Sequence, residues 1–183
     1  ADKDWLYGDG GADRLLGDGG NDYLAGGDGN DVLSGGLNAD NLVGGEGHDV
    51  LYGDSGSDQL AGDAGDDILD GGDGNDTLTG DSGVNTIDSG KGTDIIFASA
   101  GNDLLIGGFG GSSSSEFNQF DYSAGTSPLT VNMGVFDAFG TATSAEFGTD
   151  IIKVADRIIG GTGNDVFTAG TLHSGNFGTF IVF

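Results

Sequence analysis

Aspartate recurs every nine residues along the first part of this chain. Residues 8–106 divide into eleven consecutive nine-residue units without an insertion, and residues 26–34 (GGDGNDVLS) are a representative unit. The sixth position is Asp in ten units and Asn85 in the remaining one. The ten aspartates are Asp13, Asp22, Asp31, Asp40, Asp49, Asp58, Asp67, Asp76, Asp94 and Asp103. Carboxylates at one position of stacked units would repel one another, so the pattern indicates that a cation binds between them.

The ligands available to such a cation are oxygen atoms. The chain contains no Cys and two His among 183 residues, so carboxylates and backbone carbonyls are the main donors. The fourth position of the unit is Gly in ten units and Asn38 in the other, and both residue types tolerate a left-handed backbone. Flexible turns that gather six or more hard oxygens favour calcium over zinc or a strictly octahedral magnesium site.

Two kinds of element must position these donors. Positions one to six, rich in Gly, Asp and Asn, predict a turn, and positions seven to nine predict a short strand. Position eight is Leu or Ile in every unit, from Leu15 to Leu105, so this middle residue of the strand is expected to face inward. Two units form one coil of turn, strand, turn, strand. The eleven units therefore predict an all-β parallel solenoid with two facing sheets.

Composition and charge exclude several classes of protein. The chain has 40 Gly and one Pro, and 30 acidic residues against 5 Lys and Arg give a net charge of −25. Binding to nucleic acid or to an anionic membrane surface needs basic residues, so neither is expected. No apolar run approaches the roughly 18 residues of a membrane-spanning helix, so membrane insertion is not expected either. The chain begins at Ala1 without an initiator Met or a signal peptide, which predicts that it is a piece of a longer protein.

The nine-residue pattern resembles the GGxGxDxUx repeat of the repeats-in-toxin (RTX, haemolysin-type calcium-binding nonapeptide repeat) family of type I secreted bacterial proteins. The resemblance spans residues 1–106 and recurs in GGTGNDVFT, residues 160–168. It implies a right-handed parallel β-roll in which each calcium ion lies between one unit and the second unit after it. The main block would then hold at most nine ions.

The resemblance also implies which residues hold the ions. Position-six carboxylates, with Asp165 as a further one near the C-terminus, would act together with backbone carbonyls from the first half of each unit. The carbonyl donors implied in this way are Gly17, Gly19, Gly26, Asp28, Gly35, Leu37, Gly44, Glu46, Gly53, Ser55, Gly62, Ala64, Gly71 and Asp73.

The sequence predicts three segments. Residues 1–106 form the β-roll, residues 107–147 an irregular or β insert, and residues 148–183 further repeat-like turns with a C-terminal cap. Nine of the eleven Phe lie after Gly111, and both outward positions of the last two units carry large apolar residues, Phe97 and Ile106 among them. Because an open solenoid end must be covered, we expect a Phe-rich β segment to cap the C-terminal end. Asp150 stands where a ligand aspartate would fall.

The sequence favours a calcium-binding structural module of a secreted or cell-surface bacterial protein, of the adhesin or surface-layer type. It would fold and become rigid at extracellular calcium concentrations of about 10⁻⁴ to 10⁻³ M. The alternative is the non-catalytic C-terminal secretion and folding module of a secreted metalloprotease or lipase. An enzyme is not expected, because the protease-like GDSG segments at residues 53–56 and 80–83 are positions one to four of the repeat. Calcium is the expected partner, and self-association or a cell-surface partner stays open.

Overall fold

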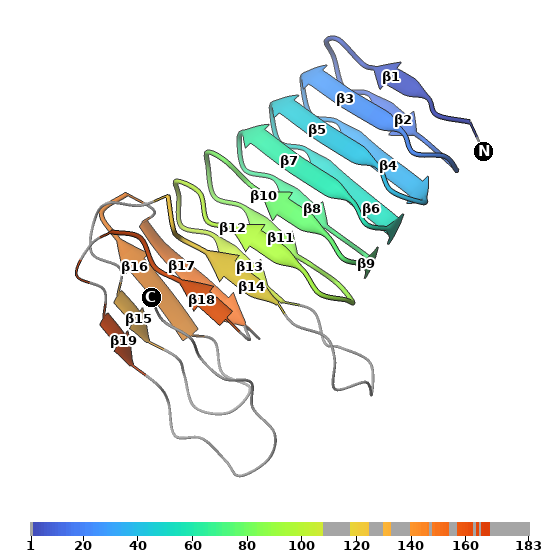
Figure 1. Ribbon diagram of the computed structural model, residues 1–183. Coiled ribbons are helices and arrows are strands. Elements are labelled where there is room, and N and C mark those ends of the chain that lie inside the picture. The colour runs from blue at the N-terminus through green and yellow to red at the C-terminus, as the bar shows by residue number, and fades with distance from the viewer. Residues whose placement is uncertain are drawn as a thin grey trace.

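The computed structural model describes residues 2–107, 118–124, 130–132, 140–146, 148–153, 157–162, 164 and 166–168. All regular elements in these residues are strands, which stack into a solenoid of coils running from one end of the molecule to the other (Figure 1). No helix in this part of the chain is long and apolar enough to cross a membrane. The predicted all-β parallel solenoid is therefore confirmed.

The first sheet contains eight strands in the order β1-β3-β5-β7-β10-β12-β14-β18, and all neighbouring strands pair in parallel. Its strands are β1 (Trp5–Tyr7), β3 (Tyr23–Asp28), β5 (Asn41–Glu46), β7 (Gln59–Ala64), β10 (Thr77–Thr79), β12 (Ile95–Phe97), β14 (Gln119–Asp121) and β18 (Arg157–Ile159).

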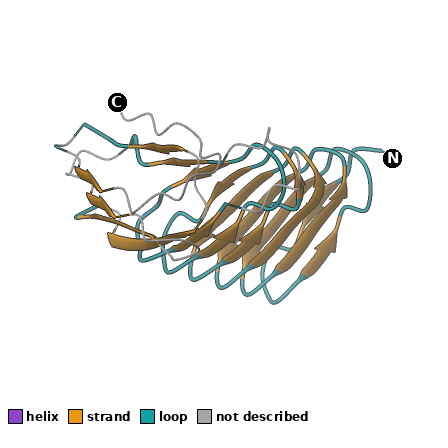
Figure 2. Cartoon of the chain, turned by 90° about the horizontal axis from the view of Figure 1, so that it is seen from below, coloured by secondary structure: helices purple, strands orange, loops and turns teal. Residues whose placement is uncertain are grey.

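The second sheet faces the first and contains eleven strands in the order β19-β15-β16-β17-β13-β11-β8-β6-β4-β2, with β9 paired to β6 (Figure 2). Pairing is parallel from β2 to β17, whereas β16 is antiparallel to both β17 and β15. Its strands are β2 (Arg14–Leu16), β4 (Val32–Leu37), β6 (Val50–Gly56), β8 (Ile68–Asp70), β9 (Asp73–Gly74), β11 (Thr86–Asp88), β13 (Leu104–Ile106), β15 (Thr130–Asn132), β16 (Gly140–Ser144), β17 (Gly148–Lys153) and β19 (Val166–Thr168).

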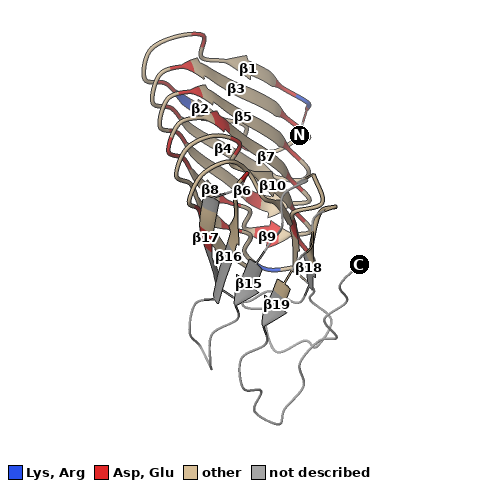
Figure 3. Cartoon of the chain, turned by 90° about the vertical axis from the view of Figure 1, so that its left-hand side faces the viewer, with Lys and Arg blue, Asp and Glu red and all other residues tan. Residues whose placement is uncertain are grey.

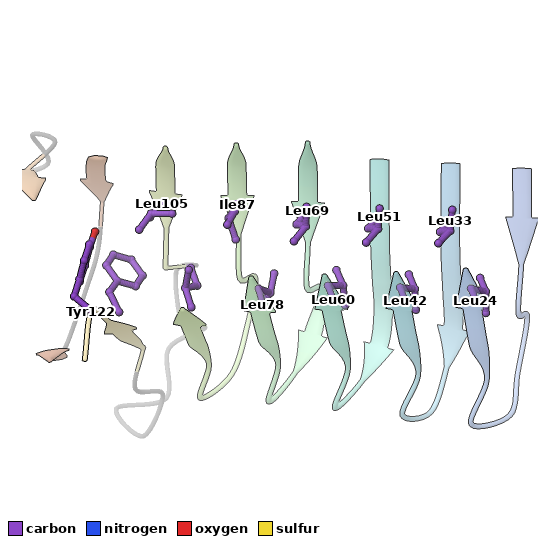
Figure 4. Close-up of a cluster of buried hydrophobic side chains, with 12 residues drawn as sticks. Leu24, Leu33, Leu42, Leu51, Leu60, Leu69, Leu78, Ile87, Leu105 and Tyr122 are labelled. Atoms are coloured by element: carbon purple, nitrogen blue, oxygen red, sulfur yellow. The ribbon is translucent and has the colours of Figure 1, made fainter. Parts of the chain in front are cut away.

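The core is a double row of position-eight side chains, one row from each sheet (Figure 4). Leu24 and Leu42 of the first sheet and Leu33 and Leu51 of the second are each 0 % exposed. Paired strands are offset by 18 residues, as in Leu24↔Leu42, so two nine-residue units make one coil. Units 2 to 11 therefore each contribute one buried aliphatic residue, as the sequence predicted, and Leu15 of unit 1 is partly buried against the same core.

The strands in the middle of the roll are longer than predicted. β3, β4 and β5 each extend from position seven through position three of the next unit, six residues in all. Positions six and one are buried as well as position eight, so three positions face inward. The extension passes through position two in a left-handed conformation, with φ of 105° at Gly27 and 70° at Asp54. The inward orientation of position eight is confirmed, and the structure adds positions six and one.

The coils continue beyond the main repeat block with longer connections. β14 pairs with β12 at Ile96↔Phe120, an offset of 24 residues, and β17 pairs with β13 at Leu105↔Ile152, an offset of 47. Phe120 is fully buried and extends the inner row of aliphatic side chains. Eight of the eleven Phe lie outside the described residues, and so do the serine run at 112–115 and residues 178–183. The Phe-rich cap stays a prediction: Phe97 is 42 % exposed and Ile106 is half-buried.

Candidate metal centre

The position-six residues form two buried rows, one along each edge of the roll. With unit 1 beginning at Gly8, odd-numbered units cross from the first sheet to the second and even-numbered units cross back. The first row comprises Asp13, Asp31, Asp49, Asp67, Asn85 and Asp103, and the second row Asp22, Asp40, Asp58, Asp76 and Asp94. From Asp22 onward none of these side chains is more than 3 % exposed. The two rows place a stack of carboxylates inside the turns, where acidic residues gather (Figure 3).

One side-chain oxygen of each row member from Asp22 onward is a structural acceptor. The backbone N–H of Asp31 donates to Oδ1 of Asp49 at 2.8 Å, and the N–H of Asp22 donates to Oδ1 of Asp40 at 2.7 Å. The same bond joins residues 18 apart from Asp4 to Asp103 in both rows. This hydrogen bond gives a backbone N–H of each turn an acceptor in the next coil, and it fixes the register between coils.

The other carboxylate oxygen has no hydrogen-bond partner in units 1 to 8. These buried Oδ2 atoms belong to Asp13, Asp22, Asp31, Asp40, Asp49, Asp58, Asp67 and Asp76. A buried acceptor without a partner costs about 1–3 kcal/mol, and more when it is charged, so eight of them in one small module need an explanation. A bound cation beside each row satisfies these oxygens.

Each of these oxygens borders a space that only glycine leaves open. A Cβ atom at Gly17 would lie 2.5 Å from the carbonyl oxygen of Gly35 and 2.7 Å from Oδ2 of Asp22. We call this space a cradle: it lies beside a position-one glycine, between Oδ2 of the same unit and the position-one carbonyl of the second unit after it. We call the position that a Cβ atom would take at a glycine its Cβ point. Both oxygens lie within 3.0 Å of the Cβ point at Gly8, Gly17, Gly26, Gly44, Gly53, Gly62 and Gly71. At Gly35 the Oδ2 of Asp40 lies 2.5 Å from it.

The cradles fit calcium by their donor chemistry. A carboxylate oxygen and a carbonyl oxygen from neighbouring coils face one space, which matches the hard oxygen ligands that calcium prefers. Among the described residues no group of three or more His, Asp or Glu side chains is placed to hold one metal ion, so carbonyls must complete any ligand set. The residues that would hold the ions are thus the position-six aspartates and the position-one carbonyls, and the ion would supply charge compensation between coils.

The structure places some of the expected carbonyl ligands at cradles. The carbonyls of Gly26, Gly35, Gly44, Gly62 and Gly71 lie at cradles, and so do those of Gly80 and Ser89, which the sequence reasoning missed although they occupy the same position.

The expected position-three carbonyls have another task. Those of Asp28, Leu37, Glu46 and Ala64 each accept a position-four N–H from a neighbouring coil at 2.7–3.2 Å, so one lone pair of each is already engaged. Gly19, Ser55 and Asp73 occupy the same place in their turns, and Asp165 lies outside the described residues.

Burial makes these carboxylates difficult to ionise without a cation. Loss of solvent, with a smaller contribution from neighbouring acidic residues, raises the pKa of Asp58 to about 7 and those of Asp67 and Asp76 to about 6. The N–H that each carboxylate accepts lowers the pKa but does not offset the burial. Because a cation in the cradle favours the ionised form, calcium binding and proton release are expected to be coupled.

A ladder at position five was not predicted. Oδ1 of Asn30 accepts the N–H of His48 at 3.0 Å, Nδ1 of His48 accepts the N–H of Asp66 at 2.9 Å, and Oδ1 of Asp66 accepts the N–H of Val84 at 2.8 Å. His48 is therefore a link in a structural ladder along the exposed edge of the turns. The recurrence of Asn at this position, in Asn30 and Asn75, was the available signal.

Two row residues beyond unit 8 have hydroxyl partners. Oδ2 of Asp103 accepts the hydroxyl of Ser99 at 3.2 Å, and Oδ2 of Asp150 accepts the hydroxyl of Tyr122 at 2.7 Å. Asp150 continues the first row, since its Oδ1 accepts the N–H of Asp103 at 3.0 Å. The sequence placed Asp150 as a ligand-like aspartate but carried no signal for its pairing with Tyr122.

Comparison with known proteins agrees with this geometry. A family model described as RTX calcium-binding nonapeptide repeat (4 copies) matches residues 1–33, 17–51, 34–69, 52–87, 79–112 and 155–171. No curated protein matches the chain. The matched residues cover more than half of the chain and include both rows of aspartates, so this chain belongs to the RTX calcium-binding nonapeptide repeat family.

Proposed function

We propose that this module folds and becomes rigid when it binds extracellular calcium, and that it serves as a structural segment of a secreted or surface-attached bacterial protein. The observation that carries the proposal is the set of eight buried Oδ2 atoms, each beside a glycine cradle and without a hydrogen-bond partner. Without cations these atoms and the excess of acidic residues oppose the compact state. With cations the same atoms tie each coil to the next.

The test is circular dichroism of the full chain in millimolar calcium, in magnesium, and in a calcium chelator. We expect strand signal in calcium, and its loss in chelator with magnesium unable to restore it. An unchanged strand spectrum after chelation would contradict coupled folding and binding.

We further propose that the module belongs to a surface structural protein of the adhesin or surface-layer type. Large apolar side chains on the outer faces of the roll support lateral contacts: Trp5 is 59 % exposed, Tyr7 58 % and Ile68 49 %. Exposed apolar residues are common singly, so the proposal needs its own measurement. Light scattering in calcium is expected to show assembly that magnesium does not produce, and a monomer at all protein concentrations in calcium would argue against it.

A further inference from the structure

The turns after unit 8 differ from those before it in one consistent way. Every turn of units 1 to 8 combines glycine at position one with aspartate at position six. The register of the strands identifies the same two positions in the next five turns, and none of them has both residues. The five pairs are Gly80 with Asn85, Ser89 with Asp94, Ala98 with Asp103, Gly107 with Asn118, and Tyr122 with Asp150.

We propose that units 1 to 8 hold eight calcium ions, one in each cradle, and that the five turns that follow are closed to calcium, two of them by a protein hydroxyl. This inference rests on the proposed function, because it assigns which turns hold the calcium that the function requires.

The first closed turn has an amide where a carboxylate oxygen would be. Nδ2 of Asn85 lies 2.5 Å from the Cβ point of Gly80, in the place that Oδ2 of Asp67 occupies at Gly62. An amide nitrogen donates hydrogen bonds and cannot ligate a cation. In the second closed turn, Ser89 puts a side chain where the cradle needs glycine.

Two later turns replace the cation with a hydroxyl. The Ser99 hydroxyl donates to Oδ2 of Asp103, and the Tyr122 hydroxyl donates to Oδ2 of Asp150. Tyr122 stands at position one, because its N–H donates to the Ile159 carbonyl at 2.8 Å as the N–H of Gly8 does to Ala25 at 2.9 Å. The Tyr122 side chain thus occupies the space that glycine leaves open upstream, and it is 1 % exposed at the end of the core (Figure 4).

The structure therefore assigns Tyr122 as an internal substitute for calcium. Its hydroxyl satisfies a carboxylate oxygen that would otherwise be buried without a partner, and Oδ1 of the same carboxylate still holds the amide of the preceding coil. The row can continue in register through this turn with no metal ion.

Counting bound calcium in the full chain by native mass spectrometry tests the inference. Relative to the wild type, we expect one ion fewer in Asp67→Asn and one ion more in Asn85→Asp, which restores a carboxylate beside Gly80. The carbonyl of Ser89 already lies 2.5 Å from the Cβ point of Gly71, so a residue other than glycine can supply the carbonyl, as Ala98 must in the Asn85→Asp variant.

A matched pair in the second row keeps the test decisive if Asn85→Asp does not fold. Asp76 and Asp94 are both 1 % exposed, and each accepts a backbone N–H at 2.8–2.9 Å. Asp76→Asn is expected to lose one ion and Asp94→Asn none. Equal losses in the two variants, or an unchanged count in a folded Asn85→Asp, would overturn the inference. A wild type that binds no calcium at all would instead refute the proposed function.

Discussion

The position-six aspartates use Oδ1 in the same way in the turns of units 1 to 8 and in the turns that follow, but they use Oδ2 differently. In both regions Oδ1 accepts a hydrogen bond from a backbone N–H of a neighbouring coil. At one end of the roll the N–H of Asp4 donates to Asp22, and at the other end the N–H of Asp103 donates to Asp150. In units 1 to 8 Oδ2 faces a glycine cradle, whereas at Asp103 and Asp150 it accepts a hydroxyl.

This difference separates the two tasks of the repeat. The hydrogen bond from a backbone N–H to Oδ1 sets the register of the solenoid. It does not depend on a metal ion, so it persists where the cradles end. The cradle is an additional feature that needs glycine at position one and a free carboxylate oxygen. Substitutions that affect one task and spare the other can test the separation.

The largest effect is expected from filling a cradle. A Cβ atom at Gly44 would lie 2.5 Å from Oδ2 of Asp49 and 2.7 Å from the Gly62 carbonyl, so Gly44→Ala should lose one calcium ion and destabilise the roll by about 3 kcal/mol. Urea unfolding in calcium measures the change. The matched control is Gly19→Ala, where the nearest atom to the new Cβ is that of Leu37 at 3.8 Å. A similar loss in both variants would contradict the cradle.

Removing the Tyr122 hydroxyl should have the next largest effect. Tyr122→Phe leaves Oδ2 of Asp150 buried without its donor, which costs about 1–3 kcal/mol. The calcium count should stay at the wild-type value, because the ring still fills the turn. Urea unfolding combined with native mass spectrometry checks both statements, and a gain or loss of calcium would argue against the role assigned to Tyr122.

The pH dependence should have opposite signs with and without calcium. Burial raises the pKa of Asp58 to about 7 and those of Asp67 and Asp76 to about 6, against 3.8 for an unperturbed Asp. The calcium-free fold therefore holds more protons than the unfolded chain between about pH 4 and 7, so its stability falls as the pH rises through 6–7.

Calcium needs the ionised carboxylates, so its affinity should rise over the same range. Isothermal titration calorimetry in buffers of different ionisation enthalpy measures the protons released on binding. An affinity that does not change between pH 5.5 and 8 would contradict the buried-carboxylate account.

A surface ion pair gives the smallest expected effect. Lys91 Nζ lies 2.5 Å from Oδ1 of Asp73, and both side chains are 61 % exposed. Exposed pairs contribute about 0–1 kcal/mol, so Lys91→Ala should change the free energy of unfolding by less than about 1 kcal/mol and leave the calcium count unchanged. The measurement is urea unfolding in calcium, and a loss as large as that of Gly44→Ala would show that the surface matters more than the cradles.

The sequence predicted the repeating part of the fold because its signals are local and periodic. Leu or Ile at position eight indicates the inner rows, and Asp at position six indicates the ligand rows. The length of the strands was underestimated, since position one carries glycine and gives no apolar signal although it faces inward. Pairing of β14 with β12 and of β17 with β13 was not predicted, because offsets of 24 and 47 residues break the nine-residue period.

The sequence predicted the carboxylates of the candidate site better than its other parts. The sequence assigned position one only to the turn, whereas the structure shows that glycine there leaves room for two facing oxygens. The bond from Tyr122 to Asp150 joins residues 28 apart across an irregular connection, and no pattern in the sequence relates them. Such contacts depend on how the coils stack and are found only in three dimensions.

Anomalous diffraction from crystals of the full chain grown in calcium tests the central claim most directly. Calcium peaks are expected about 2.3–2.6 Å from Oδ2 of the position-six aspartates and from the position-one carbonyls of units 1 to 8. No peak is expected beside Asn85, Asp103 or Asp150. Peaks confined to exposed acidic residues such as Asp54 and Asp81, with none in the cradles, would contradict the account.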